Sequence, residues 1–383
     1  MSLDNNTLAF FELLRAGLWE KETRLSQYSG IDYSAIMKMA EEQSVVGLIT
    51  AGLEHVRDVK IPQAWTLRFI GSTLQIEQQN KAMNGFVAQL IELLRKRDVY
   101  TLLVKGQGIA QCYEKPLWRT SGDVDLLLSD TNYEKAKEVL LPLAIEADTE
   151  FKSLRHLALT MKEGFVVELH GALHSRLSGR MDRVIDKAQQ DGFYNGNVRS
   201  WNNGRTTVFL PSPDNDVIFV FTHILKHFYI EGIGLRQICD WCRLMWTYRD
   251  ELDLQKLESG IKEAGLMSEW KAFAAFAVKY LGMPEEAMPL FNTNDNRKAN
   301  SKKADRILNF VLETGNFGHN RQHKHSDNFF VGKIQGACFK LRDFIRHARV
   351  FPLDSVKFFL HYAMNGVTVA KDISSRKNRS LKI

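Results

Sequence analysis

Apolar residues recur at three- and four-residue intervals from Leu8 to about Arg97, in segments such as LAFFELLRAGLW and SAIMKMAEEQSVVGLITAGLEHV. This spacing gathers apolar side chains on one face of a helix, so it predicts a helical N-terminal region over residues 1–97. Between residues 98 and 210 the apolar runs become short and β-rich, which is typical of strands. From Pro211 the helical spacing returns and predicts a helical C-terminal region over residues 211–383.

The central region is predicted to contain four strands. They are VYTLLVKG, VDLLLS, residues 156–161 and FVVELHG. The segment TNYEKAKEVLLPL between the second and third strands is predicted to be an amphipathic helix, with Asp130 or Thr131 as its N-cap. This pattern indicates an α+β fold, in which a small mixed sheet is flanked by N- and C-terminal helical regions. The last helices are expected from Phe329 to about Ala348 and from Leu353 to about Ala363.

The composition is that of a soluble globular protein, with 383 residues of which 44 % are hydrophobic and 25 % charged. No apolar stretch approaches the roughly 20 residues that cross a bilayer, and the N-terminus lacks the basic region and cleavage site of a secretory signal. Four cysteines are too few and too scattered for a disulfide framework. We therefore expect a cytoplasmic protein with no membrane partner.

The formal net charge of +6 indicates a basic protein. Scattered lysines on a solvated surface explain most of this excess, because they are a common means of keeping a protein soluble. An anionic substrate such as a nucleotide is the other interpretation. Nucleic acid is disfavoured as a partner, because the sequence has no basic stripe interleaved with aromatic residues.

The second predicted strand begins with two carboxylates, in the segment RTSGDVDLLL. Asp123 and Asp125 are two residues apart, so in a strand they share a face and their charges repel each other. A divalent cation such as Mg²⁺ between them would remove this repulsion. Asp-x-Asp alone is a weak signal, and a solvated strand end is the simpler alternative.

Upstream, the segment LLVKGQGIA is an apolar strand that runs through Gly106 into a helical pattern. The free backbone N–H groups at such a junction can bind a phosphate, and Lys105 would add a positive charge. A lysine at a strand end is, however, often simply solvated. The segment is not a Walker A loop, because the GKS or GKT ending is absent.

Downstream, Glu168 falls in the middle of the apolar strand FVVELHG, where an uncompensated carboxylate is costly. Alternation places Val166, Glu168 and His170 on one face. If this strand lies beside the one that carries Asp125, a third carboxylate faces the same cation. The alternative is that Glu168 and His170 lie on the exposed face of an edge strand.

Together these segments, KGQGIA, the Asp-x-Asp strand and VELHGAL, make the chain resemble nucleotidyltransferase-like proteins of the DNA polymerase β superfamily, in a bacterial and largely uncharacterised branch. In this resemblance Gly106 occupies the glycine position of the superfamily signature, and Gln107 stands where serine is commonest. Asp123 and Asp125 match the pair of metal ligands. Glu168 matches the third carboxylate, which is usually an aspartate.

The resemblance implies an enzyme that uses Mg²⁺ (or Mn²⁺) to transfer a nucleoside monophosphate from an NTP to a hydroxyl of an unknown small-molecule or protein acceptor. Asp123, Asp125 and Glu168 would be the catalytic residues and the metal ligands, and Glu168 could also take the proton. The nucleotide would be bound by Lys105, Gly106, Gln107, Gly108 and Arg119. For Arg119, a structural ion pair with Asp123 or Glu146 is an equally favoured alternative to nucleotide binding.

Four further residues are predicted as substrate contacts: His170, His223, Arg236 and Asp240. His223 and His227 are four residues apart and share a helix face, but no third zinc ligand is evident. Arg236 and Asp240 have the same spacing and are expected to pair.

The alternative function is a non-catalytic nucleotide-binding or toxin–antitoxin-like regulatory module on the same fold. The carboxylate trio favours an enzyme, whereas Gln107 leaves room for this alternative. Because the two aspartates repel each other, the sequence also predicts that Asp125→Asn removes catalysis and leaves the fold intact or slightly stabilised.

Overall fold

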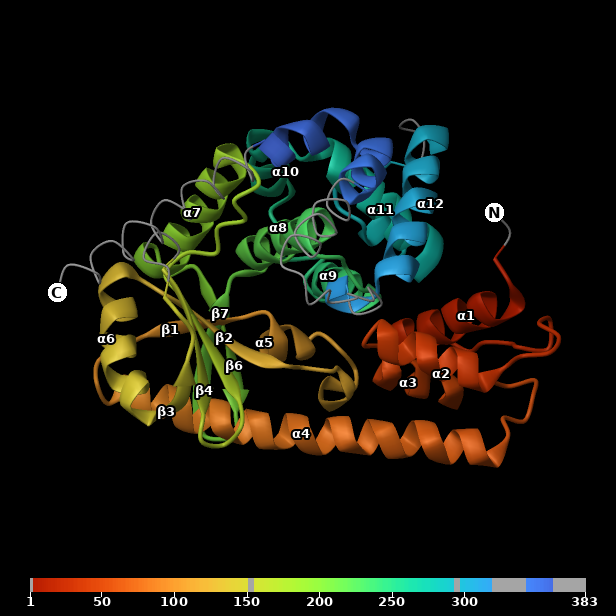
Figure 1. The fold of residues 1–383 in the computed structure, drawn as a ribbon, viewed down its shortest axis with the longest axis horizontal. Coiled ribbons are helices and arrows are strands. Elements are labelled where there is room, and N and C mark those ends of the chain that lie inside the picture. The colour runs from red at the N-terminus through yellow and green to blue at the C-terminus, as the bar shows by residue number, and fades with distance from the viewer. Residues whose placement is uncertain (1–2, 151–154, 293–296, 319–341, 361–383) are drawn as a thin grey trace, which may run out of the picture.

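The computed structural model describes residues 3–150, 155–292, 297–318 and 342–360, and Figure 1 shows how its helices and strands are arranged. Three N-terminal helices form one group: α1 (Asn5–Trp19), α2 (Tyr33–Glu42) and α3 (Val46–Glu54). The 33-residue helix α4 (Gln63–Arg95) runs from this group along the whole length of the β-sheet region. The N-terminal region is therefore helical, as its apolar spacing predicts.

The sheet has five strands in the order β1-β2-β5-β4-β3. The central pair, β2 and β5, is parallel, whereas the other neighbouring pairs are antiparallel. The sheet is therefore mixed, and the α+β class predicted from the sequence is confirmed. The bounds are Thr101–Val104 (β1), Asp123–Leu128 (β2), Ala144–Ala147 (β3), His156–Met161 (β4) and Val166–His170 (β5).

Strand alternation gives the sheet one apolar face and one face with a polar end. Val124, Leu126 and Leu128 of β2 are buried in a core formed with α4 and with helix α6 (Asp130–Leu140). The alternate residues Asp123 and Asp125 therefore belong to the opposite face, which faces helix α8 (Pro213–Ile230). The burial of the apolar side chains fixes the side of the sheet on which the carboxylates lie.

Four elements of the central region were not predicted from the sequence. Strand β3 has four residues that are mostly exposed, and it lies at the edge of the sheet, so its apolar pattern is weak. Helix α7 (Gly179–Tyr194) has many charged residues around a narrow apolar stripe. The hairpin of β6 (Val198–Asn203) and β7 (Thr206–Pro211) forms a separate two-stranded sheet, and β6 reads as polar.

The C-terminal region is helical as far as it is described. No helix in the described part of the chain combines the length and the apolar character needed to cross a membrane. Residues 329–341 of the helix predicted from Phe329 lie outside the described residues. Residues 361–363 of the helix predicted from Leu353 also lie outside them. The other described helices of this region are α9 (Leu235–Thr247), α10 (Leu254–Ala264), α11 (Met267–Leu281), α12 (Arg297–Thr314) and residues 342–350 and 352–360. Short 3₁₀ turns lie at Pro116–Trp118 and Leu141–Leu143 in the central region, and at Glu285–Ala287 and Asn316–Gly318 in the C-terminal region.

Helix α8 is held by aromatic packing in a second core. Phe221 of α8 stacks on Trp241 of α9 with 5.1 Å between ring centroids, and it meets Trp270 of α11 edge-on at 4.8 Å. All three side chains are buried. This packing fixes the rotation of α8 about its axis and therefore the face that it presents to the sheet.

Helices α1 and α3 approach each other closely at two glycines. A Cβ atom on Gly52 would lie 2.0 Å from the Leu13 carbonyl oxygen, and one on Gly17 would lie 1.9 Å from that of Leu48. These distances leave no room for a methyl group. By contrast, a Cβ on Gly71 of α4 would meet no atom within 4 Å.

We predict that Gly52→Ala destabilises the protein by about 1–3 kcal/mol or more, because the backbones of α1 and α3 must move apart. Gly71→Ala is the matched control, and it should stabilise by up to about 1 kcal/mol, because alanine favours the helix interior. Urea unfolding of both variants measures this difference. Equal effects of the two substitutions would contradict the close packing of α1 on α3.

Candidate functional site

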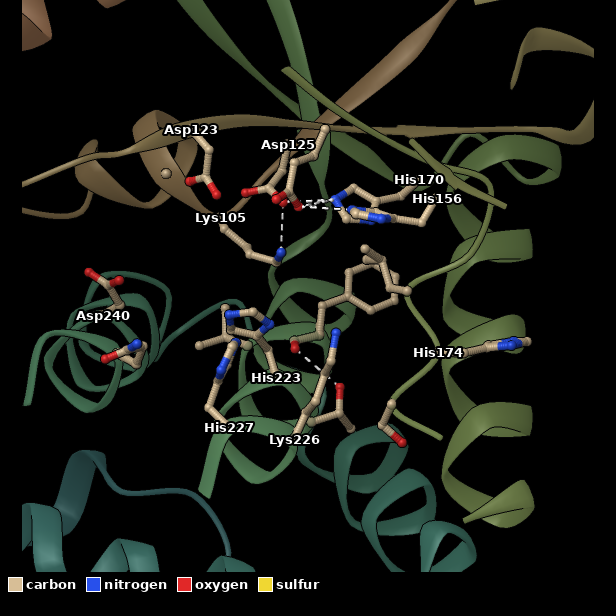
Figure 2. A pocket seen from close by; sticks show the side chains of 18 of the residues that line it. Lys105, Asp123, Asp125, His156, His170, His174, His223, Lys226, His227 and Asp240 are labelled. Atoms are coloured by element: carbon tan, nitrogen blue, oxygen red, sulfur yellow. Dashed lines mark hydrogen bonds and ion pairs between the residues drawn. The ribbon is translucent and has the colours of Figure 1, made fainter. Parts of the chain in front are cut away.

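A cavity of about 750 Å³ lies between the polar face of the sheet and helices α8 and α9. This volume is in the range of small-molecule sites, which is about 300–1,000 Å³. Figure 2 shows carboxylates and imidazoles on the sheet wall, and His223, Lys226 and His227 on the wall formed by α8. The cavity therefore has walls of different chemical character.

Three carboxylates meet on the sheet wall. Asp125 of β2 is paired in register with Glu168 of the parallel neighbour β5, and Asp123 lies two residues before Asp125 on the same face. Carboxylate oxygens of the three residues lie within 4.8 Å of one another. The structure thus brings together the three carboxylates that the sequence singles out.

Lys105 and His170 compensate the buried carboxylate of Asp125, which is 3 % exposed. Lys105 Nζ lies 2.7 Å from Asp125 Oδ1, and His170 Nε2 lies 2.8 Å from the same oxygen. Burial alone would raise the pKa of Asp125, but Lys105 and His170 lower it below its usual value. The same carboxylates raise the pKa of Lys105 despite its burial.

The backbone at the end of β1 is bent so that Lys105 can reach Asp125. Lys105 has a φ of 58° and Gly106 a φ of 38°, and the first of these is unfavourable for a residue with a side chain. Such strain persists only where surrounding contacts hold it, and the ion pair with Asp125 is one of them.

Glu168 is compensated by two imidazoles. Its Oε2 atom lies 3.2 Å from His156 Nε2 and 3.3 Å from His170 Nε2. Burial acts to raise the pKa of Glu168, but these contacts hold it far below its usual value. His170 bridges Asp125 and Glu168, and both contacts raise its pKa against the effect of burial.

Asp123 has the least compensation of the three carboxylates. Burial, together with repulsion by Asp125 and Glu168, raises the pKa of Asp123 to about 6. The charge repulsion predicted from the sequence therefore acts mainly on Asp123, whose pKa it raises. The expectation for Asp125→Asn changes accordingly, since that substitution would leave Lys105 and His170 beside a neutral amide, and we expect it to destabilise the fold.

The donor set of Asp123, Asp125 and Glu168 fits a hard divalent cation. All of the donors are carboxylate oxygens, which Mg²⁺ and Mn²⁺ prefer, and they lie within 4.8 Å of one another. The three carboxylates outnumber the one ammonium group that contacts them, Lys105, so the trio carries an excess of negative charge. A dication would offset this excess.

Two residues of the predicted phosphate-binding turn line the cavity, and the other two pack against neighbouring side chains. Lys105 and Gly106 line the cavity, and Gly106 opens the short helix α5 (Gly106–Ala110). Gln107 is buried, and its side-chain amide donates to the thioether of Met83 on α4. Gly108 packs against Leu210, where a Cβ would lie 2.8 Å from a side-chain carbon. Nucleotide binding by Gln107 and Gly108 stays a prediction, and these contacts give each of them a structural role.

Arg119 forms a buried pair with a residue far away in the sequence. Its Nη2 lies 2.6 Å from Asp240 Oδ2 and its Nε lies 3.1 Å from Asp240 Oδ1. The Tyr113 hydroxyl donates to the same carboxylate at 2.8 Å. The partner of Arg119 is therefore Asp240, in place of the Asp123 or Glu146 suggested by the sequence. The pair joins α9 to the segment before β2.

The other predicted contact residues also lie at the cavity. Arg236 donates to the Thr120 carbonyl oxygen at 2.8 Å, and burial and the nearby Arg119 lower its pKa to about 10. His223 lines the cavity, where burial and Lys105 hold the pKa of its imidazole well below the usual value. Its contact is with the ring of His227, at 4.2 Å between centroids.

Sequence reasoning missed several residues that line the cavity, among them His156 and Lys226. His156 could have been found, because alternation along β4 and the antiparallel register place it directly opposite His170. Lys226 lies three residues after His223 on α8 and so on the same helix face. No local pattern indicates that this face lines a cavity, since that depends on how α8 packs.

Comparisons with known proteins identify a family for this chain. A family model described as uncharacterised nucleotidyltransferase matches residues 29–282, a range that contains every residue lining the cavity. A solved structure of an antigenic nucleotidyltransferase-like protein from Paracoccidioides brasiliensis is similar at 16 % identity, with a TM-score of 0.30 over 49 % of this chain and 87 % of that one. No curated protein matches the chain.

We predict that Asp240→Asn destabilises the protein by about 3–5 kcal/mol, because it leaves the Arg119 guanidinium buried without its counter-charge. Asp250→Asn is the matched control, because Asp250 forms an exposed ion pair with Arg249 at 3.5 Å. That substitution should cost about 1 kcal/mol or less. Urea unfolding measures both, and a small effect of Asp240→Asn would show that the buried pair does not hold α9 in place.

Proposed function

Because the chain belongs to the family of uncharacterised nucleotidyltransferases, we propose that it transfers a nucleoside monophosphate from an NTP to a hydroxyl of a small-molecule or protein acceptor, with Mg²⁺ or Mn²⁺. The observation that carries this proposal is the trio of Asp123, Asp125 and Glu168, whose oxygens lie within 4.8 Å of one another at a cavity of about 750 Å³.

Asp123, Asp125 and Glu168 would hold the metal ion. When bound, the ion would supply positive charge beside the phosphate oxygens and favour ionisation of the acceptor hydroxyl. In the reaction, the acceptor oxygen bonds to the α-phosphorus and the bond to the leaving pyrophosphate breaks. Lys105 keeps Asp125 ionised and its carboxylate oriented through the contact at 2.7 Å.

The wall formed by α8 supports a polyphosphate as the ligand. Lys226 lines the cavity opposite the carboxylates, and burial and Lys105 lower its pKa. A phosphate beside Lys226 would add a favourable negative charge to those of Glu231 and Glu168. We propose that the phosphates extend from the carboxylate trio towards Lys226, with Arg236 and His223 as further contacts.

A non-catalytic nucleotide-binding module is the second candidate. The contact of Gln107 with Met83 favours it, because the superfamily signature places serine at this position and Gln107 supplies no hydroxyl there. Both candidates require nucleotide binding, and only the first requires release of pyrophosphate. The two are therefore separable by experiment.

We predict that Asp123→Asn abolishes pyrophosphate release from ATP, GTP, CTP or UTP in the presence of Mg²⁺, and that the melting temperature without metal stays unchanged or rises. The substitution removes one ligand of the ion, and it also relieves repulsion by the other two carboxylates, worth up to about 1 kcal/mol. Pyrophosphate release and thermal melting measure the two effects.

Asp186→Asn, at an exposed carboxylate that pairs with His174 outside the trio, is the matched control and should leave pyrophosphate release unchanged. If no NTP raises the melting temperature of the wild type with Mg²⁺, the proposed function is wrong. Stabilisation by an NTP without pyrophosphate release, in the presence of candidate acceptors, would favour the second candidate.

We predict that Lys226→Ala raises the Kd of the Mg²⁺–NTP complex about tenfold, equivalent to about 1.4 kcal/mol, through the loss of a charge-assisted phosphate contact. Lys187→Ala is the control, because Lys187 is exposed and pairs with Glu263 at 2.7 Å. Calorimetric titration measures both variants. An unchanged Kd for Lys226→Ala would place the phosphates elsewhere in the cavity.

A further inference from the structure

A second group of metal-binding side chains lies beside the carboxylate trio. His156 of β4 and His170 of β5 are directly opposite each other in the antiparallel register, and Glu168 shares their face of the sheet. One ligand atom from each of these three residues lies within 4.8 Å of the other two. This group differs from the trio, because two of its three donors are imidazole nitrogens.

The spacing of these atoms suits a metal ion. Glu168 Oε2 lies 3.2 Å from His156 Nε2 and 3.3 Å from His170 Nε2. In a tetrahedral site with bonds of about 2.0–2.1 Å, neighbouring ligand atoms lie about 3.3 Å apart. The two contacts of Glu168 already have this separation, so small movements of the rings would complete the arrangement.

The position in the fold makes this group accessible to an ion. All three residues line the cavity, and the side chain of His156 is 39 % exposed. Ala158, the register partner of Glu168 on β4, has a small side chain. Three protein ligands with an open side towards the cavity are typical of sites that keep a position for water or substrate.

We propose that His156, Glu168 and His170 form a binding site for a borderline transition-metal ion such as Zn²⁺, distinct from the carboxylate site for Mg²⁺. Imidazole nitrogen favours such ions, whereas Mg²⁺ favours oxygen ligands alone. The two sites share Glu168, so an ion at one of them withdraws a ligand from the other. Occupation by Zn²⁺ therefore competes with Mg²⁺, a consequence that rests on the proposed function.

The test uses Co²⁺ as a spectroscopic substitute for Zn²⁺ on the full chain. In the wild type, Co²⁺ should give the intense visible absorption of a four- or five-coordinate site with nitrogen ligands. His156→Ala should weaken Co²⁺ binding more than about tenfold, because it removes a ligand. Asp123→Asn should keep the absorption, because Asp123 belongs only to the carboxylate trio. His174→Ala, at a histidine that instead pairs with Asp186 at 2.6 Å, should also keep it.

Three outcomes would overturn the proposal. They are the absence of visible Co²⁺ absorption, an unchanged affinity in His156→Ala, and loss of the absorption in Asp123→Asn with retention in His156→Ala. None of these readouts depends on catalysis, so failure of the proposed function leaves the Co²⁺ result standing. If transfer activity is present, Zn²⁺ should inhibit the wild type in the presence of Mg²⁺ and inhibit His156→Ala at least about tenfold less strongly.

Discussion

The concentration of three carboxylates on one face of the sheet is the constraint on which the rest of the site depends. Asp125 and Glu168 are register partners on parallel strands, so their backbones hold them together in every state of the folded protein. Like charges at this separation are costly unless they are compensated. Lys105 and His170 supply that compensation, and the strained backbone at Lys105 is part of its cost.

The position of the carboxylates follows from the packing of the two hydrophobic cores. Leu126 and Leu128 are buried against α4 and α6, which leaves the alternate positions of β2 to face the cavity. On the opposite wall, Phe221 is fixed between Trp241 and Trp270, so the rotation of α8 is fixed as well. The site is thus formed between two packed layers whose apolar faces point away from it.

Local patterns in the sequence predicted the features that depend on local geometry. Alternation placed Asp123 with Asp125, and Glu168 with His170, because a strand has a fixed period of two residues. The pair of Arg119 and Asp240 spans 121 positions, and no local pattern encodes such a contact. The environment of Gln107 likewise depends on where Met83 of α4 lies. The sequence left open whether β5 lies beside β2, so their parallel pairing required the structure.

The opposite walls of the cavity restrict what it can bind. The sheet wall carries three carboxylates beside the single ammonium group of Lys105, whereas the α8 wall carries Lys226. A free polyphosphate would be repelled by the carboxylates, and a free dication would gain nothing from Lys226. A ligand that brings a dication and an anionic tail together matches both walls at once. The charge distribution of the cavity therefore favours a metal–polyphosphate complex over either component alone.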